Sequence, residues 1–266
     1  MIDAQAGAHG VKLFVCIYDD CRLLSHFLRH YHQFGITEFH VAAPPDLAVH
    51  VSLASRHYCV RQYNDLNVED SFLGGAAAVS EMRRIAQGAD EWVVIVDLDE
   101  FVEFGGPVAQ IVARIDGEGA NIAQGIMFDR FAVDGQPKAF GDDAVLADVY
   151  PVRARFIHTV MKGYDIKAVL VRGQLKNRVA NHLFHGQRPY SRQFDISHYK
   201  WTERALDRVK SAYEMLSAIK APWAEEFKRI LDHYEENGRF AWETFGGEFA
   251  AQAMPAATAA RAVSDT

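Results

Sequence analysis

The chain has 266 residues, of which 49% are hydrophobic, and a formal net charge of −7. This length and composition predict a single globular domain with a core of its own, and the negative charge argues against binding nucleic acid or an anionic membrane through bulk charge. No apolar run approaches the roughly 20 residues of a membrane span, and the first ten residues lack the pattern of a signal peptide. We therefore expect a cytoplasmic protein with reduced cysteines, whose membrane contact is at most peripheral, at the inner face.

Strand and helix patterns alternate after a loose tail over residues 1–10. β-Branched and apolar runs predict strands, and apolar residues at helical spacing predict helices between them. The predicted strands cover residues 11–17, 38–43 and 59–63, and the predicted helices cover residues 23–34 and 75–87. This alternation indicates an α/β fold with a Rossmann-like, mostly parallel sheet that is flanked by helices on both faces.

A central strand is predicted at residues 91–96, where five apolar residues run straight into three acids. The acids are Asp97, Asp99 and Glu100, and they come at the carboxyl end of the strand, where open α/β sheets place their ligands. If the strand continued, Asp97 and Asp99 would point the same way. Two carboxylates at this edge suit a hard cation such as Mn²⁺ or Mg²⁺, although an Asp-x-Asp can also simply end a strand at the surface.

The second half of the sequence is less regular. We predict a helix from Pro107 to 115, a strand at 122–128, a surface excursion at 129–148 and short strands over 149–184. Two amphipathic helices close the domain within residues 202–240, and residues 250–266 are expected to be disordered. No linker divides residues 11–249, so they are predicted to form one domain.

Five stretches in chain order resemble the bacterial glycosyltransferases of family 2 type and the related family 92 enzymes. They are Tyr18 to Asp20, Phe27 to Gly35, Asp97 to Phe101, Lys167 with Arg172, and His198 to Trp201. The resemblance implies a GT-A fold, a nucleotide-diphosphate sugar donor and a divalent metal. It also implies a glycan or lipid-linked acceptor, as in the synthesis of surface polysaccharide or lipopolysaccharide.

The sequence departs from the family pattern at two places. Asp19-Asp20 stands where relatives carry Asn-Glu, and Ala43-Pro44-Pro45-Asp46 stands where they often show Asp-Asn. Both segments lie where the family holds the base and ribose, so the nucleotide stays open.

The resemblance also implies roles for single residues. Asp99 would contact the metal, Asp97 the ribose or a metal-bound water, and His198 the metal or the diphosphate. Glu100 would order either aspartate or be a solvated strand end. The residues expected to bind the nucleotide or its phosphates are Asp19, Asp20, Asp97, Lys167, Arg172 and Lys200. For Lys167 and Arg172, the competing interpretation is the solvated face of a strand.

An inverting transferase needs a base within hydrogen-bond reach of the acceptor hydroxyl. Asp129, just after a predicted strand, and Asp195, just before the late histidine, are the candidates for the catalytic base. The sequence does not rank them, because reach depends on geometry, and most loop aspartates form turns or caps.

Two rival interpretations stay open. An aspartate-nucleophile phosphohydrolase also places Asp-x-Asp after a buried strand, but near the start of the chain and with a Thr or Val where this sequence has Phe101. An inactive relative that only binds nucleotide sugars is the second. His26 and His30 have the spacing of a zinc-protease helix but lack its glutamate, so they predict an amphipathic helix instead.

Overall fold

The computed structural model describes residues 10–66, 74–179 and 182–250. The predicted tails therefore fall outside the described residues, except for Gly10 and Ala250. Within the described ranges, no helix is long and apolar enough to cross a membrane.

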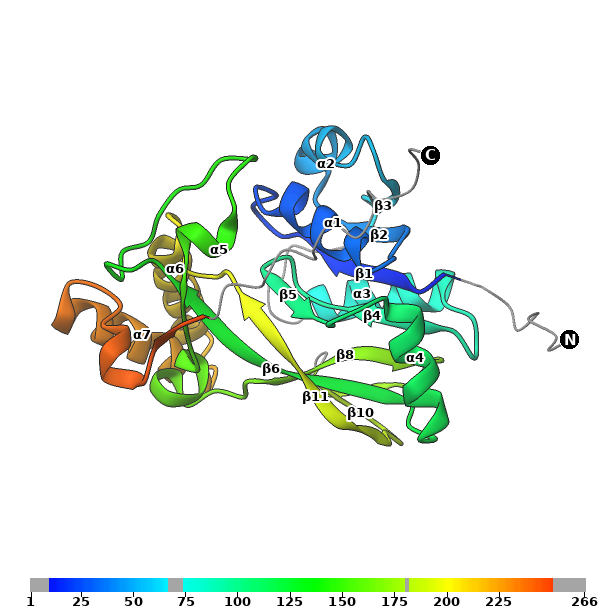
Figure 1. Ribbon diagram of the computed structural model, residues 1–266. Coiled ribbons are helices and arrows are strands. Elements are labelled where there is room, and N and C mark those ends of the chain that lie inside the picture. Colours follow the sequence, from blue (N-terminus) through cyan, green and yellow to red (C-terminus); the bar gives the residue numbers. More distant parts are fainter. Residues whose placement is uncertain (1–9, 67–73, 180–181, 251–266) are drawn as a thin grey trace, which may run out of the picture.

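Four parallel strands form the first half of the sheet, in the order β3–β2–β1–β4 (Figure 1). They are β1 (Lys12–Cys16), β2 (Glu38–Ala42), β3 (Cys59–Tyr63) and β4 (Trp92–Ile95). Helices α1 (Leu24–Gln33), α2 (Ala48–Ala54, after the short η1 Pro45–Leu47) and α3 (Gly74–Ala86) connect them. The strands and the helices α1 and α3 predicted from hydrophobic periodicity are thus confirmed, whereas α2 was not predicted.

Helices cover both faces of this half, as predicted. Alternate β1 residues point to opposite sides: Leu13 and Val15 pack in one core with α1 and with α4 (Val108–Gly117), whereas Phe14 and Cys16 pack in a second core with α3. The connection after β1 therefore runs over one face and the connection into β4 over the other. The carboxyl ends of β1 and β4 meet at the point where the chain switches sides.

An antiparallel extension continues the sheet beyond β4. The added strands follow the order β4–β8–β6–β7–β12, and each pairs antiparallel with its neighbour. They are β6 (Ile122–Phe131), β7 (Val152–Ala154), β8 (Ile166–Arg172) and β12 (Glu248–Phe249). The α/β fold class with a Rossmann-like sheet is confirmed. The excursion expected at 129–148 is shorter, because β6 runs on to Phe131 and α5 (Leu146–Val149) follows.

Two strands beside the acid turn were not expected from the sequence. β5 (Glu100–Glu103) begins at the third acid, and the long β11 (Pro189–His198) pairs antiparallel with β5 and parallel with β6. Gly125 on β6 makes room for β11, since a Cβ at this position would lie 2.6 Å from a side-chain carbon of Ile196. β11 thus brings the end of β6 beside the turn that follows β4.

The C-terminal segment is helical, as predicted. Helix α6 (Ala205–Ala218) packs against α7 (Ala224–Asn237), and the short η3 (Trp242–Phe245) follows. The remaining short elements are the π-helix η2 (Ile157–Met161) and the hairpin strands β9 (Asn177–Val179) and β10 (Leu183–Phe184). In Figure 1, α6 and α7 lie together at the side of the sheet where β6 and β11 end.

Candidate functional site

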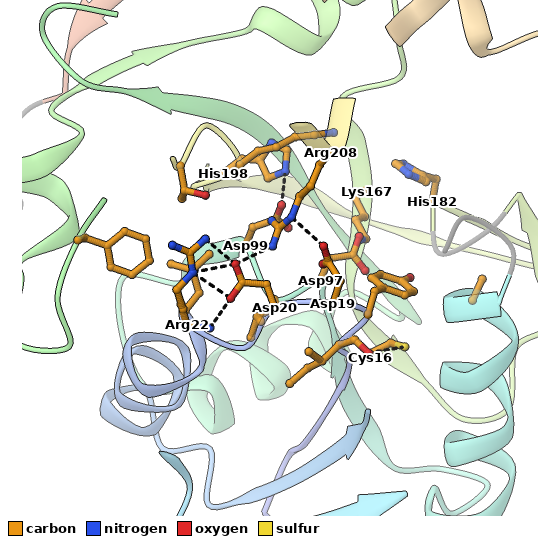
Figure 2. Close-up of a pocket in the computed structure, with 18 residues that line it drawn as sticks. Cys16, Asp19, Asp20, Arg22, Asp97, Asp99, Lys167, His182, His198 and Arg208 are labelled. Carbon is orange, nitrogen blue, oxygen red and sulfur yellow. Dashed lines mark hydrogen bonds and ion pairs between the residues drawn. The ribbon is translucent and has the colours of Figure 1, made fainter. Parts of the chain in front are cut away.

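A pocket of about 280 Å³ opens at the carboxyl ends of β1 and β4 (Figure 2). Segments far apart in the sequence line it, among them the loop after β1, the turn after β4, β8, the end of β11 with the residues that follow it, and α6. Its polar lining residues are Tyr18, Asp19, Asp20, Arg22, Asp97, Asp99, Lys167, His182, His198, Lys200, Thr202 and Arg208. Most of the residues predicted to bind nucleotide or metal are therefore brought together in one pocket.

The acids after β4 lie in a turn, not on a continuing strand. β4 ends at Ile95, and the buried carboxylate of Glu100 accepts a hydrogen bond of 2.8 Å from the backbone N–H of Asp97. The side chain of Glu100 is 3% exposed, so it is no solvated strand end; it orders Asp97. The backbone N–H of Tyr199 donates to the carbonyl of Asp99 at 2.7 Å, which ties β11 to the same turn.

Lys167 lies buried behind the acids. Its Nζ is 2.5 Å from Asp97 Oδ2 and 2.7 Å from Glu100 Oε2, and the residue is 1% exposed. Burial alone would lower the pKa of this ammonium group, but the charges of the two carboxylates raise it above its ordinary value. Lys167 is therefore not on a solvated face. It holds a fixed positive charge at the wall of the pocket, where its predicted contact with phosphate stays a prediction.

His198 links a half-buried acid, Asp99, to a fully buried one, Asp129. The strand register places it opposite both Glu100 on β5 and Asp129 on β6. Its Nε2 is 3.3 Å from Asp99 Oδ2 and its Nδ1 is 3.0 Å from Asp129 Oδ1. Burial by itself would lower the pKa of the ring, but Asp99 and Asp129 raise it to about 10. Each ring nitrogen thus contacts a carboxylate, and the predicted contact of His198 with a metal or with the diphosphate stays a prediction.

Neither acid predicted as the catalytic base lines the pocket. Asp129 is fully buried and accepts three hydrogen bonds, from His198, from Trp201 Nε1 at 2.9 Å and from the backbone N–H of Ile157 at 3.0 Å. It positions His198 and does not open to an acceptor. Asp195 lies on the outer part of β11 and pairs with Arg153 at 3.0 Å.

The loop after β1 forms the opposite wall. Asp20 Oδ2 is 2.7 Å from Arg22 Nη2 and 2.7 Å from Arg208 Nη2, and Asp19 Oδ2 is 3.1 Å from Arg208 Nε. Burial would raise the pKa of Asp20, but its bonds with Arg22 and the charge of Arg208 lower it below its ordinary value. Arg22 also pairs with Glu203, just before α6. Figure 2 shows Arg208 reaching over the pocket toward Asp19 and Asp20.

Arg172 is not at this site. β8 runs antiparallel to β4, and the register sets Arg172 beside Trp92, at the amino end of β4. The side chain pairs with Asp116 at 3.1 Å, at the edge of the sheet away from the pocket. Lys167 and Arg172 lie on the same strand, β8 (Ile166–Arg172). This strand runs from the end of the sheet that carries the pocket to the opposite end, so only Lys167 lines the pocket.

The structure also adds five polar lining residues that sequence reasoning did not assign to the site: Tyr18, Arg22, His182, Thr202 and Arg208. Tyr18 and Arg22 flank the predicted aspartates, so proximity in the sequence was a usable signal. Arg208 lies on a predicted amphipathic helix, and no feature of the sequence assigned it to the site. The Nδ1 of His182 is 2.8 Å from the carbonyl of Ile166. In the sequence, only a second histidine three residues later, His185, drew attention to it.

The lining of the pocket carries charges of both signs. Four acids (Asp19, Asp20, Asp97 and Asp99) face four permanently charged bases (Arg22, Lys167, Lys200 and Arg208) and the ring of His198. A diphosphate would bring more negative charge than this lining offsets, and a divalent cation bound with it would supply the rest. Such a cation needs only one or two carboxylates besides phosphate oxygens. No cluster of three or more histidine, cysteine or acidic residues set to hold a metal occurs in the described part of the chain.

Asp97 and Asp99 fit the role of the two carboxylates. Their side chains remain 40% and 29% exposed within the pocket, although each already contacts a basic side chain. The two acids are therefore the residues that would hold Mn²⁺ or Mg²⁺ together with substrate phosphates.

Comparisons with known proteins give distant similarities only. No family model matches the chain, and no curated protein does. Among solved structures, HddC from Yersinia pseudotuberculosis is 8% identical over 46% of this chain, with a TM-score of 0.33, and the match spans 60% of the length of HddC. CMP:2-keto-3-deoxy-manno-octonic acid synthetase in complex with CTP is 13% identical over 77% of this chain and 99% of its own, with a TM-score of 0.38.

Proposed function

We propose that the protein is a metal-dependent glycosyltransferase that moves a sugar from a nucleotide-diphosphate donor to an acceptor hydroxyl. One observation carries this proposal. Asp97 and Asp99 open into a single pocket at the switch point of the sheet, and basic side chains from β8, β11 and α6 line the same pocket. Carboxylates for a hard cation beside bases for phosphate form the set that binding a nucleotide diphosphate requires.

The residues divide the chemical work among them. A divalent cation, when bound by Asp97 and Asp99, would act as a Lewis acid toward the diphosphate. His198, Lys200 and Arg208 would offset the negative charge that grows on the leaving group. Asp129 holds the ring of His198 in place through Nδ1. Inversion remains a prediction of the family resemblance. Because neither Asp129 nor Asp195 lines the pocket, the group that accepts the proton of the acceptor hydroxyl would be another acid that does.

The phosphohydrolase alternative would use Asp97 as the nucleophile. In that class of enzyme the acid follows a strand near the start of the chain, whereas Asp97 follows β4, the fourth strand of this chain. This position favours transfer from a nucleotide sugar over phosphoester hydrolysis.

Thermal unfolding with a panel of nucleoside diphosphates and nucleotide sugars, with and without Mn²⁺, tests the proposal. A ligand at a concentration of about 100 Kd stabilises the native state by ~2.7 kcal/mol, which raises Tm measurably. We expect a metal-dependent rise with one nucleotide, and turnover of its sugar that Asp99→Ala abolishes. Asp195→Ala is the matched control, because it removes an exposed aspartate outside the pocket.

Turnover that is unchanged in Asp99→Ala would overturn the proposal. A native protein whose Tm responds to no nucleotide, but that releases phosphate from a simple phosphoester in a reaction requiring Asp97, would establish the phosphohydrolase. Nucleotide binding without any turnover or donor hydrolysis would point to the inactive relative.

A further inference from the structure

The ring of His182 lies at the wall of the pocket, just before β10. Its Nδ1 is 2.8 Å from the carbonyl oxygen of Ile166, the first residue of β8. The ring of Tyr164 packs edge-on against it, with the two ring centroids 5.7 Å apart. Figure 2 shows His182 at the side of the pocket that carries Lys167. The contacts with Ile166 and Tyr164 therefore fix where this ring lies.

The contact with Ile166 decides which ring nitrogen of His182 carries the proton. A carbonyl oxygen can only accept a hydrogen bond, so Nδ1 donates. Burial and the charge of Lys167 lower the pKa of the ring below its ordinary value of 6.5, although the bond to Ile166 and the charge of Asp97 oppose this shift. The ring is therefore neutral at pH 7, and a neutral ring has a single N–H. Nε2 is left with a lone pair.

This lone pair has no hydrogen-bond donor among the residues that the structure describes. In contrast, each of the four carboxylates that line the pocket already contacts a basic side chain. The pairs are Asp19 and Asp20 with Arg208, Asp97 with Lys167, and Asp99 with His198. Nε2 is therefore a neutral acceptor that the pocket can offer to a ligand.

The surroundings of His182 indicate which group of a ligand would reach Nε2. The charges of Lys167 and Asp97 both act on the ring, so it lies near the acids that would hold the cation and the diphosphate. In a nucleotide sugar, the groups on either side of the diphosphate are the ribose and the sugar. Both carry hydroxyls, and a hydroxyl can donate a hydrogen bond to a ring nitrogen.

We propose that Nε2 of His182 accepts a hydrogen bond from a hydroxyl of the nucleotide sugar, on its ribose or on its sugar, and so favours donors that carry this hydroxyl. This inference rests on the proposed glycosyl transfer, because it concerns the donor of that reaction. A metal ion is the less suitable partner for Nε2. The charge of Lys167, which opposes a proton on this ring, would oppose a cation there in the same way.

Nitrogen NMR tests the tautomer without any ligand. In the native protein at pH 7, with ¹⁵N-labelled histidine, Nε2 of His182 should give the signal of an unprotonated ring nitrogen. The variant His182→Asn identifies this signal, because it lacks it. A ring that carries its proton on Nε2, or on both nitrogens, would overturn the inference, since Nε2 could then not accept a hydrogen bond.

Two substitutions separate the ligand contact from the contact with Ile166. In His182→Asn the side-chain amide takes the place of Nδ1, so the bond to Ile166 is kept and the acceptor is lost. In His182→Gln the amide reaches the place of Nε2, so an acceptor is kept and the bond to Ile166 is lost. His185→Asn is the matched control, since His185 is exposed and does not line the pocket.

Isothermal titration calorimetry in the presence of Mn²⁺ measures the Kd for UDP, GDP, ADP and CDP and for their glucose conjugates. For a nucleotide that binds, we expect the Kd to rise about three- to tenfold in His182→Asn, the effect of losing one hydrogen bond. The Kd should change much less in His182→Gln and in His185→Asn. A Kd that rises in His182→Gln and not in His182→Asn would show that the ring only holds Ile166, and would overturn the inference.

The set of ligands shows which hydroxyl is bound. A loss of affinity that occurs with the nucleoside diphosphate, but not with its 2′,3′-dideoxy form, would place the hydroxyl on the ribose. A loss that occurs only with the glucose conjugate would place it on the sugar. An equal loss with the dideoxy form would overturn the inference, as would weaker binding of Mn²⁺ alone in His182→Asn.

Failure of this inference can be told apart from failure of the proposed function. Native-like Kd values in His182→Asn would overturn the inference and leave nucleotide binding in place. A native protein that binds none of these nucleotides would overturn both, whichever tautomer the ring adopts.

Discussion

At the scale of single residues, the arrangement of Lys167, Asp97 and Glu100 decides how the acid turn is held. The ammonium group lies between two carboxylates that differ in exposure: the side chain of Asp97 is 40% exposed to the pocket, and that of Glu100 only 3%. Lys167 thus offsets the buried charge of Glu100, which orders the turn. It also offsets the charge of Asp97, which is available to a substrate. A buried charge without its partner is costly, whereas removing both partners is much less so.

Lys167→Met should therefore lower the free energy of unfolding by about 3–5 kcal/mol, because it leaves Glu100 buried without its cation. Glu100→Gln in the same background should recover a large part of that loss. Urea unfolding of the two single variants and the double variant at pH 7 gives the coupling between them. A Lys167→Met variant as stable as the native protein, or losses that simply add in the double variant, would contradict this account of the turn.

At the scale of elements, helix α1 illustrates how a metal-like spacing can be purely structural. His26 and His30 lie on its buried side, and each ring bonds a backbone carbonyl from a different segment: His26 Nε2 is 3.1 Å from that of Gly141, and His30 Nε2 is 2.9 Å from that of Val102. The amphipathic helix predicted for this stretch is confirmed. His30 packs edge-on against Tyr31, Phe34 and Phe101.

Burial lowers the pKa of His30 to about 4, below its ordinary value near 6.5, although the carbonyl of Val102 opposes the shift. As pH falls below about 6.5 the unfolded chain takes up a proton on this ring and the native protein does not, so the native state loses stability down to about pH 4. Because the side chain keeps some contact with solvent, we expect a loss of about 1–2 kcal/mol between pH 7 and pH 5.

The variant His30→Gln isolates this contribution, since glutamine can still donate to the carbonyl of Val102 but does not titrate. Urea unfolding of both proteins at pH 7 and pH 5 should show a steeper loss in the native protein than in the variant. Parallel losses in the two proteins would show that His30 takes up its proton equally well in the folded state.

How far the sequence predicts the elements depends on where their partners lie. β1 to β4, α1 and α3 are marked by local apolar patterns, and the sequence finds them within one or two residues. β11 is not found, because its first seven residues are exposed or half-buried, it opens with Pro189, and its pairing with β5 and β6 is entirely non-local. The same holds for the residues of the site. The apolar strand before Asp97 and Asp99 marks them in the sequence. The role of Asp129 depends on its pairing with His198 of β11, a strand that the sequence does not reveal.

At the scale of the whole molecule, an aromatic cluster joins segments more than a hundred residues apart. Trp201 lies 5.9 Å from Phe131 and 4.6 Å from Phe240, measured between ring centroids, and Phe156 lies 5.5 Å from Phe240. The cluster is adjacent to the site, since Trp201 Nε1 also donates to Asp129. It therefore packs the segment after α7 onto the sheet and supports the residue that holds His198.

Phe240→Ala should destabilise the entire fold, because the ring is fully buried and its loss leaves a cavity shared by β6 and the residues after β11. We expect a loss of about 3–5 kcal/mol in the free energy of unfolding. If the cluster unites the molecule, tryptophan fluorescence and far-UV circular dichroism should report one shifted urea transition with coincident midpoints. A fluorescence transition that moves to lower urea while the circular dichroism transition stays in place would show instead that the C-terminal helices unfold as a separate unit.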